Sequence, residues 1–180
     1  MYDVAVIGCG IVGAAAAYEL SRYNCRVLVL EAKNDVANVT TKANSAILHA
    51  GYDPTPGTLM AETNVRGVAL AKELCEKLDV EREEIGSLVL AFGEEDERHL
   101  EKLYQQGLAN GVPGIELLTA DEVHALEPNV SDKVTAALYA PTAAIVSPWE
   151  YALALAETAV VNGCELRLSA PVTGIDRAGE

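Results

Sequence analysis

The chain has 180 residues, half of them apolar and 22% charged, which is the balance of an ordinary globular protein. Its formal net charge is −14, although residues 1–60 carry only 5 acidic and 4 basic side chains. An acidic surface repels nucleic acid and anionic lipid, so neither is an expected partner, whereas the nearly neutral first third suits an anionic ligand.

Targeting and metal-binding signals are missing from the sequence pattern. No apolar run is long enough to span a bilayer, and a strand-like run begins at Tyr2, which leaves no room for a cleaved signal peptide. We therefore expect a soluble, cytoplasmic protein with no integral membrane segment. The cysteines form no C-x-x-C pair and the histidines are scattered, so we expect free thiols and no metal site; these residues are Cys9, Cys25, Cys75, Cys164, His49, His99 and His124.

The first thirty residues read as strand, helix and strand. Tyr2–Ile7 is a continuous apolar run, Ile11–Tyr23 is rich in alanine, and Arg26–Leu30 is a second apolar run that closes on Glu31. Because a helix connects the two strands, they must be parallel.

The rest of the chain alternates helices with short strands. Hydrophobic spacing and capping residues predict helices over 58–78, 94–110, 119–127 and 148–162, the third opened by a Thr119–Glu122 capping box and the fourth by Ser147 and Pro148. Short apolar runs predict strands at Ala46–Ala50, Ile85–Phe92, Ile115–Leu118, Ala136–Tyr139, Ala144–Val146, Glu165–Leu168 and Val172–Ile175, with a hairpin opening at 177–180. Lys33–Asn44 is polar and reads as a loop.

A G-x-G-x-x-G motif lies between the first strand and the first helix. Gly8 permits the tight turn, Gly10 lets the backbone approach a pyrophosphate, and Gly13 lets the helix pack on the sheet. Glu31 ends the second strand 18 residues after Gly13, where it can accept hydrogen bonds from ribose hydroxyls. The free N–H groups of the helix start favour phosphate.

The fingerprint leaves the identity of the dinucleotide open. The negative charge of Glu31 disfavours a 2′-phosphate and so argues against NADP, but it does not separate NAD from FAD. A glycine-rich turn without a ligand is the alternative that the motif alone allows.

The segment from Tyr2 to Ala32, YDVAVIGCGIVGAAAAYELSRYNCRVLVLEA, resembles the N-terminus of FAD-dependent oxidoreductases of the D-amino acid oxidase-like superfamily. The resemblance continues through TTKANSAILHAG, PGTLMA, LTADEVHALEPNV and LYAPTAAIVSPWE, so that it covers essentially the whole chain. Within the superfamily, the chain is most similar to glycerol-3-phosphate dehydrogenases and L-2-hydroxyglutarate oxidases.

That resemblance implies an α/β fold with a Rossmann-like FAD-binding domain and a parallel sheet, plus part of a second, substrate-side subdomain. The implied limits are 1–84 for the first part of the FAD-binding domain, 85–146 for the partial substrate-side subdomain and 147–180 for a truncated return to the FAD-binding domain. The cofactor implied is FAD.

Individual site residues follow from the resemblance, position by position. Gly8, Gly10 and Gly13 would meet the FAD pyrophosphate, Glu31 the adenosine ribose, and the backbone of Val172 the adenine.

The polar loop matches the family segment that passes along the pyrophosphate and the ribityl chain, through Thr41, Lys42, Asn44 and Ser45. His49 matches a histidine near the flavin ring and is the expected catalytic residue. Two plainer alternatives remain open: His49 as a buried structural histidine, and Lys42 as a solvated loop lysine.

The resemblance also implies oxidation of a secondary alcohol in a small anionic substrate, such as glycerol 3-phosphate or a 2-hydroxy acid, with hydride passed to the flavin N5. Many glycerol-3-phosphate dehydrogenases place an arginine soon after the H-x-G, where Tyr52 and Asp53 stand here, and HAGYDPTPGTLMA is more similar to the hydroxyglutarate-oxidase pattern, so the substrate stays open. We expect the 180 residues alone to be inactive and to self-associate through an unfinished sheet. The alternatives are a truncated, non-catalytic nucleotide-binding module and an NAD-dependent dehydrogenase.

Overall fold

The computed structural model describes residues 1–177, which form two compact units. The first unit contains Met1–Ala46, Leu78–Val80 and the chain from Ser147 onward, and the second contains Ile47–Lys77 and Glu81–Val146. The domain limits expected from the sequence, 1–84, 85–146 and 147–180, remain a prediction about the complete enzyme.

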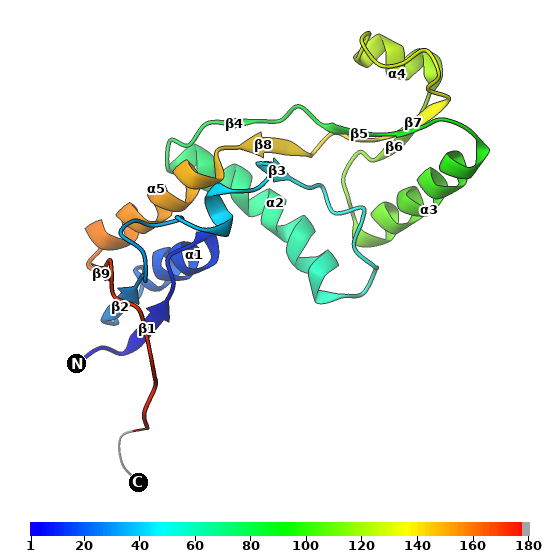
Figure 1. Cartoon of the computed structure of the whole chain (residues 1–180). Helices are drawn as coiled ribbons and strands as arrows, with labels where there is room; N and C mark the ends of the chain where they lie inside the picture. The colour runs from blue at the N-terminus through cyan, green and yellow to red at the C-terminus, as the bar shows by residue number, and fades with distance from the viewer. Residues whose placement is uncertain (178–180) are drawn as a thin grey trace. The chain divides into compact units, whose positions relative to one another are not determined.

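The first unit is built on a three-stranded parallel sheet in the order β1-β2-β9 (Figure 1). Its elements are β1 (Val4–Ile7), α1 (Ile11–Leu20), β2 (Val27–Leu30), the 3-10 turn η1 (Thr40–Lys42), α5 (Pro148–Val161) and β9 (Glu165–Arg167). The parallel pairing of β1 with β2, in the register Val4 to Val27, confirms the strand–helix–strand expectation.

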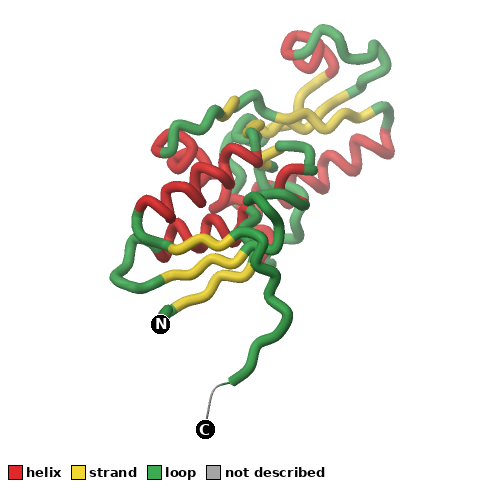
Figure 2. The backbone as a smooth tube through the Cα atoms, turned by 60° about the vertical axis from the view of Figure 1, so that its left-hand side comes forward, coloured by secondary structure: helices red, strands yellow, loops and turns green. Residues whose placement is uncertain are grey.

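One face of this sheet packs against helices (Figure 2). Alternation along β2 turns Val27 and Val29 to that face, where both are buried, while α1 and α5 pack against each other. The facing residues of the two helices are small, with Ala14, Ala17 and Ala156 buried, so their backbones can approach closely. On the opposite face Ile7 is 56% exposed; self-association through this sheet stays a prediction.

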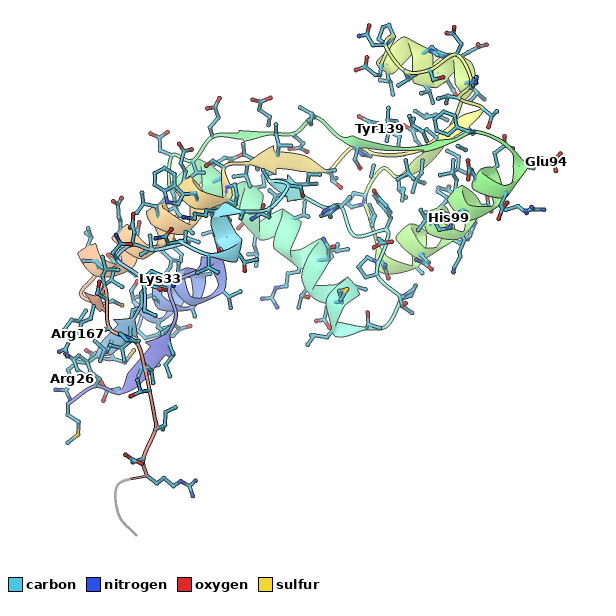
Figure 3. The ribbon with its side chains drawn as sticks, in the orientation of Figure 1. Arg26, Lys33, Glu94, His99, Tyr139 and Arg167 are labelled. Atoms are coloured by element: carbon cyan, nitrogen blue, oxygen red, sulfur yellow. The ribbon has the colours of Figure 1, made fainter. Side chains whose placement is uncertain are left out.

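The second unit contains two three-stranded antiparallel sheets, in the orders β3-β8-β4 and β5-β7-β6. Its elements are β3 (Ile47–Leu48), α2 (Leu59–Lys77), β4 (Arg82–Glu83), β5 (Ser87–Ala91), α3 (Glu94–Asn110), β6 (Glu116–Thr119), α4 (Ala120–Leu126), β7 (Ala136–Ala140) and β8 (Ala144–Val146). The core under α3 is formed by residues such as Leu100, Leu103 and Leu138. Polar residues of α3, among them Glu94 and His99, are exposed (Figure 3).

The capping signals in the sequence predicted helix starts well. Thr119 and Glu122 form the expected capping box at α4, and the Ser147 hydroxyl accepts the Glu150 N–H at the start of α5. No helix within residues 1–177 has the length and apolar character needed to cross a membrane.

The strand predicted at Val172–Ile175 is wrong. The chain before this segment stays hydrogen-bonded to the end of β2 as far as Ala170, whose N–H donates to the Glu31 carbonyl. Beyond that point no strand within residues 1–177 pairs with the chain, and Val172 and Ile175 are 37% and 80% exposed. Apolar, β-branched residues form a strand only where a neighbouring strand satisfies their backbone. The hairpin predicted at 177–180 lies largely outside the described residues.

Candidate functional site

The turn between β1 and α1 is fixed by two glycines. Gly8 has φ +93°, a conformation that residues with a side chain rarely adopt. A Cβ on Gly13 would lie 2.0 Å from the carbonyl oxygen of Gly8, so only hydrogen fits there. Gly8 is therefore required by the backbone conformation of the turn and Gly13 by the close approach of the helix to that turn, whether or not a ligand is present.

A groove of about 540 Å³ runs over this turn. It is lined by Val6, Ile7, Gly8, Gly10, Ile11, Val12, Gly13, Ala16, Thr40, Thr41 and Asn44, all of which belong to the first unit. Gly10 is the N-cap of α1 and has no side chain to accept hydrogen bonds from the first turn of the helix. The amides of that turn, which have no partner within the helix, therefore face a concave surface at the positive end of the helix dipole.

Thr41 closes the groove opposite Gly10. Its side chain is nearly buried, at 8% exposure, and its Oγ1 accepts the Ile11 N–H at 3.0 Å. A Cβ on Gly10 would lie 3.1 Å from the same oxygen, closer than most carbon contacts. The hydroxyl proton of Thr41 remains available to a ligand, because Oγ1 acts as the acceptor in its bond to Ile11.

Asn44 shapes the loop around Thr41. Its side-chain amide donates to the Thr41 carbonyl at 2.7 Å, and its Oδ1 accepts the Ala46 N–H at 2.8 Å. Ala46 has φ +62°, which Asn44 helps to hold. The polar loop is thus set against the glycine turn by its own side chains.

Glu31 joins the glycine turn to the end of β2. It is 8% exposed; Oε2 accepts the Cys9 N–H and Oε1 the Lys33 N–H, both at 2.7 Å (Lys33 is labelled in Figure 3). No cation pairs with this buried carboxylate within residues 1–177, and the two backbone amides satisfy it instead. Each oxygen keeps a lone pair, so the same carboxylate can also accept a ribose hydroxyl.

Cys9 lies inside the fingerprint, but its thiol is not a nucleophile. Burial, with the nearby negative charge of Glu31, raises the pKa of Cys9 to about 11, so the thiol stays protonated at neutral pH.

The structure brings together some of the predicted site residues. Gly8, Gly10, Gly13, Thr41 and Asn44 line the groove, and Glu31 is bonded to the backbone of the turn.

The other predicted positions do not line the groove. Lys42 is exposed and donates to the Oδ1 of Asn38, as the solvated-loop alternative expects, and Ser45 and Val172 are also exposed. The ligand roles of all these residues remain predictions.

His49 belongs to the second unit and follows β3. Its side chain is exposed within the described residues, and its carbonyl accepts a hydrogen bond from the Asn64 side-chain amide. Among residues 1–177, no group of three or more His, Cys, Asp or Glu side chains could hold a metal ion.

Two amide side chains of α3 clamp the loop that follows His49. Asn110 Nδ2 donates to the first and last carbonyls of Gly51–Pro54, at 2.9 and 2.8 Å, and Gln106 Nε2 donates to the two carbonyls between them, at 3.3 and 3.1 Å. Sequence reasoning missed this clamp. Its signal is the spacing of four between Gln106 and Asn110, which puts both amides on one face of the helix, but the spacing does not reveal their partners.

A parallel β-α-β unit with a glycine turn and a terminal carboxylate defines a dinucleotide-binding fold of the Rossmann class. The sequence model described as "DAO: FAD dependent oxidoreductase" matches residues 3–180, and the chain belongs to this family. The match decides between NAD and FAD, which the fingerprint left open.

Curated relatives and solved structures agree with the family. The chain is 50% identical to the glycerol 3-phosphate dehydrogenase of Caloramator mitchellensis, covering 98% of this chain and 37% of that protein. It is 32% identical to human mitochondrial L-2-hydroxyglutarate dehydrogenase, covering 99% of this chain and 39% of that one. The dithionite-reduced L-alpha-glycerophosphate oxidase of Mycoplasma pneumoniae, solved with FAD bound, superposes with a TM-score of 0.88 at 33% identity, covering 96% of this chain and 46% of that one. The chain therefore spans less than half the length of these relatives.

Replacing Gly10 by valine should abolish most dinucleotide binding. The branched side chain would crowd Thr41 Oγ1 and fill the groove over the first-turn amides, so we expect ADP affinity to fall at least about tenfold in calorimetry. Gly67→Val is the matched control, because a Cβ there meets nothing within 4 Å. Equal ADP affinity in a folded Gly10→Val variant would contradict the assignment of the groove.

Replacing Asn110 by alanine should loosen the loop after His49. Two carbonyls lose their donor, so the free energy of unfolding in urea should fall by about 1–3 kcal/mol, and the backbone amides of residues 49–53 should exchange faster with deuterium. Gln105→Ala on the same helix removes an amide that donates to the exposed Glu101 side chain, and it should change stability by less than about 0.5 kcal/mol. If the two variants behave alike, the clamp has no structural role.

Proposed function

We propose that this chain forms the part of a flavoenzyme that grips the ADP half of FAD. The main observation in support is the groove over the glycine turn. Its helix begins after Gly10, an N-cap without a side chain, and the buried carboxylate of Glu31 is bonded to the same turn. The groove has room for a pyrophosphate beside the N–H donors at the start of α1. The Glu31 carboxylate can still accept a hydrogen bond from a ribose hydroxyl. FAD fits these residues.

Each of these groups has a separate role in binding FAD. The first-turn amides of α1 that follow Ile11 and the Thr41 hydroxyl donate to the pyrophosphate, while the Ile11 N–H stays bonded to Thr41, and Glu31 accepts from the ribose. Asn44 keeps the Thr41 loop in place. Lys42, Ser45 and the backbone of Val172 are assigned to FAD on the family resemblance alone.

The proposed reaction is oxidation of a secondary alcohol in a small anionic substrate. When bound, FAD supplies the acceptor for the hydride of the alcohol carbon. We assign His49 the catalytic role of accepting the hydroxyl proton on an unprotonated ring nitrogen, with its backbone held by Asn64 and the loop after it held by the amides of α3.

Two substrates are the candidates, glycerol 3-phosphate and L-2-hydroxyglutarate. The relative at 50% identity is a glycerol 3-phosphate dehydrogenase, and this supports the first. The absence of an arginine soon after His49, with Tyr52 and Asp53 in its place, supports the second.

The function can be tested in a chimera. Residues 1–180 would replace the matching N-terminal part of the Caloramator mitchellensis protein, to which they are 50% identical. We expect a yellow protein that oxidises one of the two substrates with an artificial electron acceptor, while His49→Ala lowers kcat and leaves the flavin spectrum in place. The 180 residues by themselves should show no turnover, because we expect them to position the flavin and the substrate poorly. A displacement of the reacting groups by ~1 Å can lower the rate about a hundredfold.

The outcomes separate the alternatives. A folded, colourless chimera would contradict the FAD assignment. A yellow chimera without activity would favour a nucleotide-binding module, and turnover by residues 1–180 alone would show that they contain a complete active site.

The charge of Glu31 should select an unphosphorylated ribose. We expect ADP to bind residues 1–180 at least about tenfold more tightly than ADP with a 2′-phosphate, because two negative charges would otherwise meet in a largely buried site. Varying the ligand is cleaner than Glu31→Ala, since that substitution would also free the N–H groups of Cys9 and Lys33. Equal affinities for the two nucleotides would show that Glu31 does not contact the ribose.

A further inference from the structure

The second unit contains a cavity of its own, of about 220 Å³. Its apolar wall is made by Ala50 after β3, by Val65, Val68 and Ala69 on α2, and by Pro113. It shares no lining residue with the groove over the glycine turn. The size is below that of a nucleotide or drug-sized pocket and suits a small molecule.

The remaining side of the cavity carries an excess of positive charge. Arg82 Nη2 donates to Glu84 Oε2 at 2.7 Å, and Lys72 Nζ lies 3.4 Å from the same oxygen. The hydrogen bond from Arg82, supported by Lys72, holds the pKa of Glu84 below its usual range, so the carboxylate stays ionised. Two cations thus share one anion, in a chain whose net charge is −14.

Arg82 is the anchor that this side offers to a ligand. Its side chain is only 10% exposed, and within residues 1–177 its hydrogen-bonded nitrogen is Nη2. A guanidinium carries five N–H donors, and donors left without acceptors in a buried place are costly. A third lining residue, Thr142, has a buried hydroxyl with no partner among the described residues.

These features select one class of ligand. The flat guanidinium fork matches the two oxygens of a carboxylate, and the apolar wall offers contact to a hydrocarbon body, which a carboxylic acid carries and inorganic phosphate lacks. We propose that this cavity binds a small monocarboxylate with a branched apolar body, its carboxylate directed to Arg82 and Lys72 and its hydrocarbon to the α2 wall. The site is independent of FAD and goes beyond the proposed function.

The test is a titration of the isotope-labelled 180-residue chain, followed by ¹H–¹⁵N correlation spectra. The probes are 3-methylbutanoate and its uncharged isostere 3-methylbutanamide. We expect saturable shifts at Val65, Val68 and Ala69 with the carboxylate, and an affinity at least about tenfold weaker for the amide, because only the acid makes charge-assisted hydrogen bonds. Equal affinities of the two probes, or no saturable shift with either, overturn the proposal.

Three variants localise the binding. Lys72→Met keeps the apolar stem and should weaken 3-methylbutanoate about threefold to tenfold, whereas Lys102→Met, which removes the same charge from exposed α3, should leave it unchanged. Val68→Phe should fill the cavity and remove the shifts, with a dispersed spectrum as the check on folding. Undiminished binding in a folded Val68→Phe variant, or equal loss in both lysine variants, overturns the site.

Discussion

The bond between the Glu31 carboxylate and the Cys9 amide is the contact on which the first unit depends. It ties the turn after β1 to the end of β2 and, through the second carboxylate oxygen, to the chain that leaves the sheet at Lys33. A carboxylate left unsatisfied in that buried place would be strongly destabilising, so the turn, the sheet end and the following loop must form together. Glu31 shapes the site from which it would also bind a ligand.

The sequence predicted several elements of both units well because their signals are local. Two apolar runs around an alanine-rich helix specify parallel strands, and the Thr119 and Ser147 caps place the helix starts. The helix Glu94–Asn110 has the predicted bounds, because acidic residues favour its first turn and Gly111 ends it in the left-handed conformation.

The failures involve contacts with distant partners. The two-residue strand β4 is polar and has no periodic signal; it exists because β8 pairs with it. Val172–Ile175 has the composition of a strand but no partner within residues 1–177. The fingerprint glycines and Glu31 could be identified from their spacing along the sequence. The hydrogen bond between Thr41 and Ile11 instead joins residues 30 positions apart, and the Asn110 clamp joins residues more than 50 positions apart. No local pattern encodes such separations.

Gly10 and Gly13 of the fingerprint differ in the reason why evolution would keep a glycine at each position. Gly13 faces the Gly8 carbonyl at a distance that excludes any side chain, so a descendant that had abandoned its cofactor would still need glycine there to fold. A Cβ at position 10 would meet the Thr41 hydroxyl, which could shift, so a larger residue could be accepted there once no pyrophosphate had to enter. In a lineage drifting away from flavin chemistry, position 10 is where the loss would first become visible, while position 13 would keep the appearance of a working motif.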